Sequence, residues 1–293
     1  MAQSGREIKR RIASIESTQQ ITKAMEMIAA AKLRKAQEAV VATRPYFERP
    51  EASLSNALAA VERSGEDIPE IAKTRPGERH CLVVVTADRG LAGSYNSAVI
   101  RRAEEFLEEY PDTQMVIVGR KARDHFRRRN QTFLAEYVNL GDDPAPRQAQ
   151  DIGQVIYDFY VHDWFDRVTM WYTKFINTVT HRVELRQVLP IAERDPELEA
   201  QGRKSPEALY LYEPSVKEVL EVVVPLFIDA AVFQSLVEAK ASELGARMTA
   251  MRSASDNAGE LIRELNLSFN RARQAVITKE IAEIVGGADA LES

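Results

Sequence analysis

One segment of the chain has the features of a phosphate-binding turn, and it is the first place to look for chemistry. A run of apolar residues leads into Asp88-Arg89-Gly90-Leu91-Ala92-Gly93. A dinucleotide-binding fingerprint would need a third glycine at position 88, but Asp88 stands there and its charge would oppose a pyrophosphate. The chain also contains no Gly-x-x-x-x-Gly-Lys-Ser/Thr sequence. We therefore expect these glycines to shape a tight turn and not to bind a nucleotide.

The other residues that could catalyse a reaction or hold a metal are isolated in the sequence. The single cysteine, Cys81, opens an apolar run, so burial is expected, and a reducing compartment is indicated because no intramolecular disulfide is possible. No Ser–His–Asp or Cys–His arrangement can be placed. The histidines lack the spacing of a metal site: His80, His125, His162 and His181. The sequence therefore predicts no catalytic residue, cofactor or metal on this chain.

A basic cluster lies between residues 120 and 129 and could contact a nucleic acid. No aromatic residues interleave with it in the manner of a stacking platform, and the whole chain has a net charge of −5 and a pI near 5.6. A solvated helix face, or one that faces another protein, is the better interpretation. The members of the cluster are Arg120, Lys121, Arg123, Arg127, Arg128 and Arg129.

The N-terminal segment has the opposite charge to the whole chain. Residues 1–49 hold ten Lys or Arg and five Asp or Glu, which gives a local charge of +5. This charge indicates either an acidic partner or a solvated helix face, and the count leaves both open. No signal peptide or presequence is recognisable, and the most apolar stretch, 219–233, is interrupted by Glu221, Pro225 and Asp229. Membrane contact is therefore expected only through another protein.

The first of two long helical patterns begins near the N-terminus. Ser4 and Glu7 have the spacing of a capping box, and no proline occurs from there to Arg44. Pro45 and Pro50 predict a bend before the helix resumes. The apolar residues recur three or four apart but shift between groups, which predicts a stripe that winds around the helix: Ile8, Ile12, Ile15, Ile21, Met25, Ile28, Leu33, Ala36 and Val40.

The C-terminal segment has a more regular repeat. Ser215 and Glu218 predict a helix start, and Pro225 predicts a kink in that helix. A four–three spacing is apolar at eleven of twelve positions, with Ser255 as the exception: Val237, Ala241, Leu244, Met248, Met251, Ser255, Ala258, Ile262, Leu265, Phe269, Ala272 and Val276. A sustained seven-residue period predicts a left-handed coiled coil. A helix of about sixty residues spans roughly 90 Å and needs a long companion, which only the N-terminal helix of this chain can provide.

Residues 78–212 differ in character from both ends. Short apolar runs near 81–86, 115–118 and 132–138 alternate with helical patterns near 97–110, 121–129 and 147–162, and strands follow near 168–175 and 183–189. This order predicts a mainly parallel sheet with helices on its faces. The fold class is therefore α/β with a long antiparallel two-helix coiled coil and an inserted Rossmann-like domain. The predicted segments are 1–63 for the first helix, 78–212 for the inserted domain and 215–291 for the last helix.

Four stretches of the sequence resemble a known family over nearly the whole chain. They are Ile21–Gln37, Thr86–Asn96, Ala208–Pro214 and Ala246–Leu291, and they are similar to the gamma subunits of the rotary ATP synthase. The resemblance implies a single non-catalytic rotor subunit, in which the paired terminal helices form a central shaft. That shaft carries torque between the membrane c ring and a hexamer of alpha and beta subunits, and the epsilon subunit lies beside the inserted domain. ATP, ADP and Mg would bind to the alpha and beta partners, and proton flow would drive rotation.

The resemblance also implies contact residues at both ends of the shaft. Lys23, Met25, Arg273 and Gln274 match positions that contact the beta subunit, and the end of the last helix, about 277–291, would lie in an apolar collar. The basic residues Arg6, Lys9, Arg10, Arg11, Lys32, Arg34 and Lys35 could be attracted to acidic catalytic subunits. The foot that faces the c ring would include Arg44, Tyr46, Tyr212 and Glu213. The lack of a presequence suggests a bacterial-type enzyme, peripheral on the cytoplasmic face of the plasma membrane.

Two other classes of protein have the same pattern of elements. A stand-alone coiled-coil scaffold with an α/β knob would self-associate without other subunits. A small α/β enzyme with helical arms would bind a ligand through its inserted domain.

Overall fold

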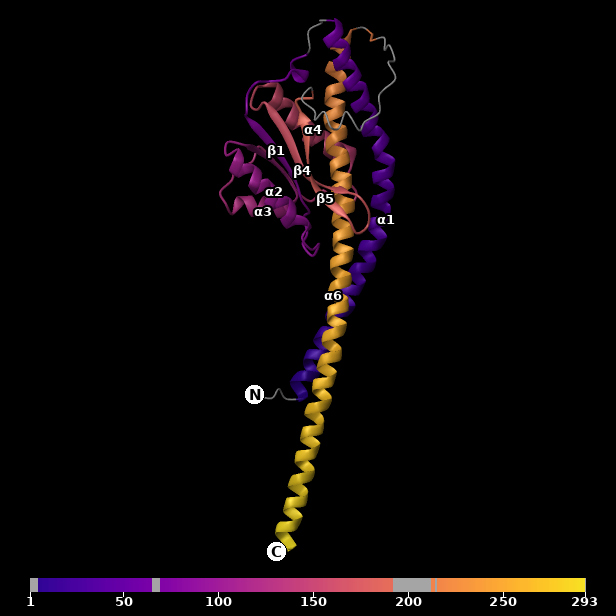
Figure 1. The fold of residues 1–293 in the computed structure, drawn as a ribbon, viewed down its shortest axis with the longest axis vertical. Coiled ribbons are helices and arrows are strands. Elements are labelled where there is room, and N and C mark those ends of the chain that lie inside the picture. Colours follow the sequence, from indigo (N-terminus) through magenta and orange to yellow (C-terminus); the bar gives the residue numbers. More distant parts are fainter. Residues whose placement is uncertain (1–4, 65–68, 192–211, 214, 293) are drawn as a thin grey trace. The chain divides into compact units, whose positions relative to one another are not determined.

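The computed structural model describes residues 5–64, 69–191, 212–213 and 215–292, without some side chains in 46–64 and 285–292. Two long helices, α1 (Gly5–Ser64) and α6 (Val216–Glu292), flank an α/β region in the sequence (Figure 1). The elements between them are η1 (Glu70–Ala72), β1 (His80–Val85), α2 (Tyr95–Glu109), β2 (Gln114–Val118), α3 (Arg120–Arg127), β3 (Ala135–Tyr137), α4 (Pro146–Val161), β4 (Arg167–Phe175) and β5 (His181–Leu189).

The chain forms two compact units that divide both long helices. One unit consists of residues 30–247 and contains the sheet, and the other consists of residues 1–29 and 248–293. The fold class predicted from the sequence, with paired long helices and an inserted α/β sheet, is confirmed.

The sheet in the larger unit has the strand order β3-β2-β1-β4-β5. β1 pairs in parallel with β2 and β4, β2 pairs in parallel with β3, and β5 is antiparallel to β4. The consecutive strands β4 and β5 can be antiparallel because they are joined by a short turn, whereas parallel neighbours need a crossover helix. The predicted mainly parallel sheet is therefore correct, with one antiparallel edge strand.

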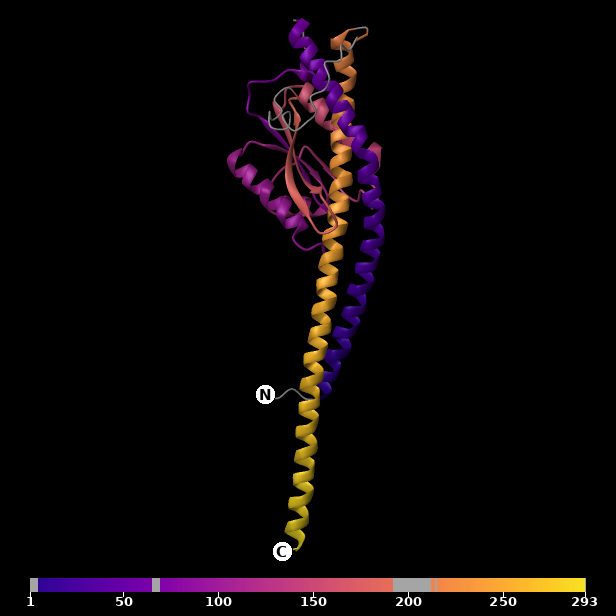
Figure 2. The same ribbon diagram turned by 45° about the vertical axis from the view of Figure 1, so that its right-hand side comes forward.

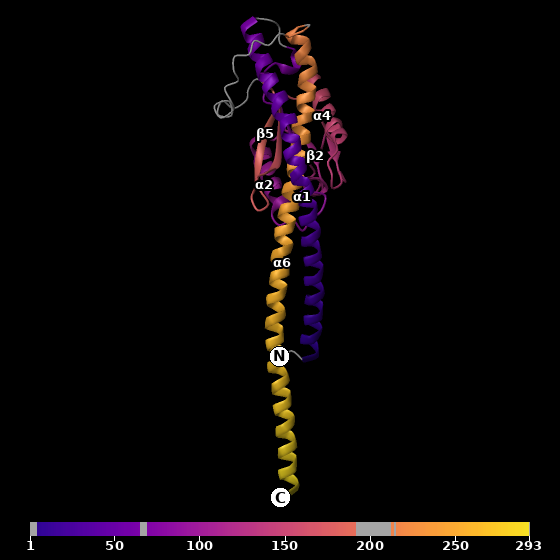
Figure 3. The ribbon, with the colours of Figure 1, turned by 90° about the vertical axis from the view of Figure 1, so that its right-hand side faces the viewer.

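The two faces of the sheet are covered by different helices. Leu82, Val84 and Ile117 point to one side and pack under α2 and α3. Val83 and Val116 point to the other side, where α4 and α6 cover them. Within this unit α6 lies between the sheet and α1 (Figures 1 and 2), and the two long helices run side by side (Figure 3).

The prolines that were expected to bend or kink the long helices lie inside continuous helices. α1 continues through Pro45 and Pro50, and α6 continues through Pro225 and Gly286-Gly287 to Glu292. The expected helix start is present at Ser215, whose side-chain oxygen accepts a hydrogen bond from the Glu218 N–H at 3.2 Å. The capping residue expected at Ser4 and the loop expected over 192–205 lie outside the described residues. By length and composition alone α6 could cross a membrane, but half of its most apolar 18-residue window is buried in the fold.

Candidate functional site: the paired helices and the junction at the sheet

In the smaller unit the two long helices pair in opposite directions. The Glu26 carboxylate accepts a hydrogen bond from Arg252 Nε at 2.9 Å, and Gln19 Nε2 donates to the Ser255 carbonyl at 3.2 Å. Further along, Gly5 lies against the Phe269 ring. Residue numbers fall on α1 as they rise on α6, so the pair is antiparallel.

The α1 side of this pair differs from the winding apolar stripe predicted by the sequence. Ile21 and Ile28 are 58% and 56% exposed, so they lie outside the seam. The seam instead keeps a four–three spacing because polar and small residues take the inward positions. Its members, all buried or half-buried, are Ile8, Ile12, Ile15, Gln19, Thr22, Glu26 and Ala29 in the smaller unit, and Leu33, Ala36, Val40 and Thr43 in the larger unit.

On α6 the seam residues follow the predicted repeat as far as the N-terminal end of α1, which lies opposite Phe269. Leu244 and Met251 are buried, and Met248, Ile262, Leu265 and Phe269 are half-buried. Val276, which the repeat also places on the seam, is 55% exposed. The reason is that α1 begins at Gly5, opposite Phe269, so it does not reach as far as Val276.

Glu26 is a buried carboxylate inside the helix pair. Its side chain is only 8% exposed, and it accepts hydrogen bonds from Lys23 on the same helix and from Arg252 on α6, each at 2.9 Å. The hydrogen bond from Lys23, followed by that from Arg252, lowers the pKa of Glu26 because both favour the charged form. The carboxylate therefore stays ionised and holds the two helices in one register.

The residues expected to contact the beta subunit lie in the smaller unit with their side chains largely accessible. The Lys23 side chain is 58% exposed although it contacts Glu26, and Met25 is half-buried. Arg273 and Gln274 are exposed on the part of α6 beyond Phe269.

The residues expected at the foot lie in the larger unit. Arg44 and Glu213 are exposed, whereas Tyr212 is half-buried and packs against the core beneath the sheet. The side chain of Tyr46 is outside the described part of the chain.

Helix α6 packs against the carboxyl end of the sheet. Open α/β sheets usually bind ligands outside the carboxyl ends of their strands, where the strand order reverses, which here is between β1 and β4. At that point Tyr95 donates a hydrogen bond to the Ala239 carbonyl at 3.0 Å, and Ser242 donates to the Thr173 carbonyl at 3.1 Å. Ala246 packs against Tyr95. The small residues of α6 thus let its backbone fill the place where such folds accept a ligand.

Several hydrogen bonds hold the glycine-containing turn after β1 in place. Asp88, which replaces the third glycine of a dinucleotide fingerprint, accepts a hydrogen bond from the Arg120 N–H at the start of α3. The Asn96 side chain accepts one from the Ala87 N–H at 2.9 Å, and Arg247 donates to the Gly90 carbonyl at 3.2 Å. The turn is therefore an attachment point for α6.

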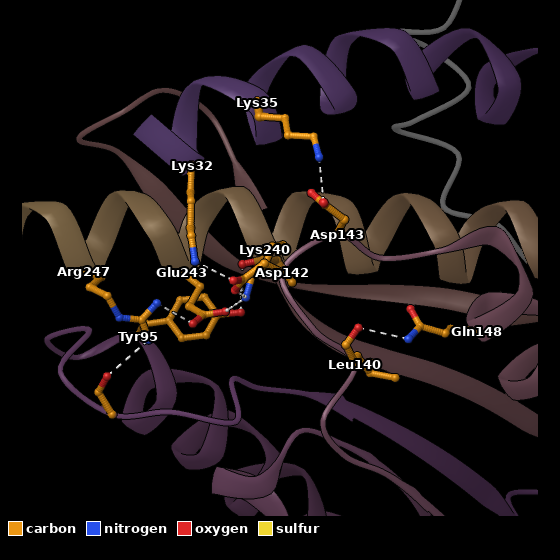
Figure 4. Close-up of polar contacts among 12 residues, drawn as sticks. Lys32, Lys35, Tyr95, Leu140, Asp142, Asp143, Gln148, Lys240, Glu243 and Arg247 are labelled. Atoms are coloured by element: carbon orange, nitrogen blue, oxygen red, sulfur yellow. Dashed lines mark hydrogen bonds and ion pairs between the residues drawn. The ribbon is translucent and has the colours of Figure 1, made fainter. Parts of the chain in front are cut away.

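A second loop, residues 140–143 between β3 and α4, contacts both long helices (Figure 4). Asp142 forms ion pairs with Lys32 of α1 at 2.6 Å and with Lys240 of α6 at 3.1 Å. Asp143 forms an ion pair with Lys35 at 2.6 Å. The hydrogen bonds from Lys32 and Lys240 lower the pKa of Asp142 to about 2. Lys32 and Lys35 were expected to attract acidic catalytic subunits, but here they form ion pairs within the chain.

No pattern in the sequence identifies these junction residues. Asp142 and Lys240 are 98 residues apart in the sequence (240 minus 142), and nothing in their spacing predicts that they meet. The same holds for Glu26 and Arg252, which are 226 residues apart.

Comparison with known proteins agrees with this architecture. A family model described as ATP synthase matches residues 4–291. The ATP synthase gamma chain of Heliobacterium modesticaldum is 47% identical over 288 residues, which cover 98% of each chain. The chain belongs to the ATP synthase gamma family. The gamma chain of Halothermothrix orenii is 45% identical over 287 residues, covering 98% of this chain and 99% of the other.

Solved structures share the fold of this gamma-family chain at lower identity. A chain from the Euglena gracilis mitochondrial ATP synthase, solved with its F1 part and c-ring, has a TM-score of 0.68 at 18% identity and covers 98% of this chain and 94% of its own. A chain from the central stalk and c-ring of the Tetrahymena thermophila mitochondrial enzyme has a TM-score of 0.61 at 24% identity, with 80% and 99% covered. The prediction of a non-catalytic central-stalk rotor subunit of an F-type ATP synthase is confirmed.

Proposed function

We propose that the chain transmits torque between a membrane c ring and a hexamer of alpha and beta subunits, and so couples proton flow to ATP synthesis. One copy serves each complex, with epsilon beside the sheet. ATP, ADP and Mg bind to the alpha and beta partners. The complex lies on the cytoplasmic face of the plasma membrane. In this proposal segments 1–63 and 215–291 are the shaft, and segment 78–212 is the inserted domain.

The observation that carries the proposal is the end of α6. Beyond Phe269 the helix continues to Glu292, although α1 begins opposite that residue. Ile277, Ile281 and Ile284 are 45%, 57% and 71% exposed and recur at helical spacing on one face. Exposed apolar faces of this kind indicate a protein contact, and an apolar collar formed by the catalytic hexamer would cover this one.

The same reasoning supports the foot and the beta contacts. Arg44 and Glu213 are exposed and therefore accessible to the c ring, and Tyr46 and Tyr212 neighbour them in the sequence. Arg273 and Gln274 are exposed polar residues next to the apolar face of α6. Ile21 and Ile28, exposed beside Lys23 and Met25, extend the accessible surface on α1.

Reconstitution tests the proposal. The chain is mixed with purified alpha and beta subunits of a bacterial enzyme, and the product is analysed for mass and ATP hydrolysis. We expect a stable, active hexamer with one central copy of this chain. A chain that self-associates into stable oligomers and forms no complex with alpha and beta would instead support the scaffold alternative.

Substitution at the beta contact gives a second test. Replacing Arg273 and Gln274 with alanine should leave the stability of the chain within about 0.5 kcal/mol of the unaltered protein, because both are exposed. Hydrolysis by the assembled complex should nevertheless fall. Arg271→Ala is the matched control, since Arg271 is also exposed but lies outside the proposed contact. Equal activity of the variant altered at Arg273 and Gln274 and of the Arg271→Ala control would contradict the assignment of the contact.

A further inference from the structure

Asp142 forms ion pairs with both long helices. Each carboxylate oxygen contacts a different helix. Oδ2 pairs with Lys32 of α1 at 2.6 Å, and Oδ1 pairs with Lys240 of α6 at 3.1 Å. The residue belongs to neither helix, because it lies in the loop between β3 and α4. Three separate parts of the larger unit therefore meet at one side chain (Figure 4).

The loop that carries Asp142 is held in place by its own hydrogen bonds. Gln148 Nε2 donates to the Leu140 carbonyl at 3.0 Å, and Gln148 Oε1 accepts the Ala145 N–H at 2.9 Å. Gly141 has φ +86°, a conformation that glycine adopts without strain and that turns the chain toward the helices. The carboxylate is thus presented by a fixed loop attached to the sheet.

On α6 the contact continues through three charged side chains that are largely buried. Lys240 pairs with Glu243 at 3.1 Å, and Glu243 pairs with Arg247 at 2.6 Å. The side chains of Lys240, Glu243 and Arg247 are only 13%, 8% and 12% exposed, so solvent screens them little. Arg247 then donates to the Gly90 carbonyl in the turn after β1. The line therefore joins α6 to two loops at the carboxyl end of the sheet.

We propose that Asp142 is a positioning residue that fixes both long helices to the sheet, so that load on the sheet-bearing unit reaches α1 and α6 in one register. The role rests on the proposed rotor function. A slip of either helix by a single residue, about 1.5 Å along its axis and about 100° around it, would turn its lysine away from the Asp142 carboxylate. Without the carboxylate, α1 and α6 would move relative to the sheet independently of each other. Part of each rotation would then not be transmitted.

Asp143 provides a matched control in the same loop. It pairs with Lys35 alone, and the side chains of Lys35 and Asp143 are 71% and 69% exposed. An exposed single pair of this kind contributes little, and it reaches only α1. Asn in place of Asp143 makes the same chemical change, one residue from Asp142, without breaking the contact to α6.

The experiment compares variants of the complete complex in liposomes, with ATP hydrolysis and ATP-driven proton pumping measured on the same preparation. Loss of a partly exposed pair shifts the balance between the held and the slipped register by at most about fivefold. Asp142→Asn should therefore keep hydrolysis within about twofold of the unaltered complex but lower the number of protons pumped per ATP. Asp142→Glu should recover most of the ratio, and Asp143→Asn should leave it unchanged. Lys32→Gln, at an exposed lysine that folding tolerates, should lower the ratio in the same direction.

Three outcomes would overturn the role of Asp142: an unchanged pumping ratio in Asp142→Asn, equal losses in Asp142→Asn and Asp143→Asn, or a parallel fall in hydrolysis and pumping that Asp142→Glu does not reverse. Failure of the proposed function itself gives a different result, because the unaltered chain would then form no complex that pumps.

Discussion

Replacement of Gly245 by valine tests how closely α6 approaches the sheet. A Cβ atom at Gly245 would lie 3.0 Å from the carbonyl oxygen of Thr178, in the turn between β4 and β5. This separation is shorter than an ordinary contact, and the neighbouring atom is backbone. The turn has little room to adjust within itself, since the Asn177 side chain accepts hydrogen bonds from the N–H groups of Val179 and Thr180. The added side chain must therefore push α6 and the turn apart.

The expected cost follows from two opposing terms. Overpacking of this kind costs about 1–3 kcal/mol, whereas valine is favoured over glycine inside a helix by about 0.4 kcal/mol. We expect Gly245→Val to lower the free energy of unfolding by about 1–2 kcal/mol. Gly259→Val is the matched control on the same helix, because its Cβ would meet only the end of the Gln19 side chain, also at 3.0 Å. That side chain can move, so the control should change stability by less than about 0.5 kcal/mol.

Urea-induced unfolding of the full chain, followed by far-ultraviolet circular dichroism, measures both variants. The midpoint should fall for Gly245→Val, with the slope of the transition unchanged. A Gly245→Val protein as stable as the unaltered chain, or a control that loses more stability than the test variant, would refute the close approach of α6 to the β4–β5 turn.

Three further predictions concern the helices and their junction. Leu244→Ala should lower the free energy of unfolding by about 2–5 kcal/mol, because the side chain is 3% exposed, whereas Leu261→Ala, at 49% exposed, should change it by less than about 0.5 kcal/mol; urea unfolding of the pair decides. Leu265→Pro should break α6 at a cost of roughly 3 kcal/mol or more and prevent assembly with alpha and beta subunits, and normal coupled ATP hydrolysis would contradict the shaft assignment. The pKa of Asp142 is lowered from 3.8 to about 2, so its ion pairs stabilise the fold above pH 3.8 and this contribution is lost as the pH falls toward 2. After allowance for the exposure of the carboxylate, the stability difference between the unaltered chain and Asp142→Asn should shrink by about 0.5 kcal/mol between pH 5 and pH 3, as measured by urea midpoints.

The sequence predicted most of the helices and strands because their signals are local. The four–three repeat from Val237 onward predicted the inward positions of α6 as far as Ala272, beyond which α1 no longer covers α6. The winding apolar stripe predicted for α1 was wrong at Ile21 and Ile28, which are exposed. Their inward neighbours Gln19, Thr22 and Glu26 are polar, and hydrophobic periodicity cannot detect a polar seam.

What the sequence by itself determined is the class of the protein: two long helices that need each other, an α/β insert, and a turn after β1 that lacks the glycine pattern of a nucleotide site. Only the tertiary structure decided how these parts are joined. α6 fills the carboxyl end of the sheet, and Asp142 bridges Lys32 and Lys240 although the three are far apart in the chain. Periodicity and turn chemistry report on residues within a few positions of one another, whereas an ion pair depends on which distant surfaces the fold brings together.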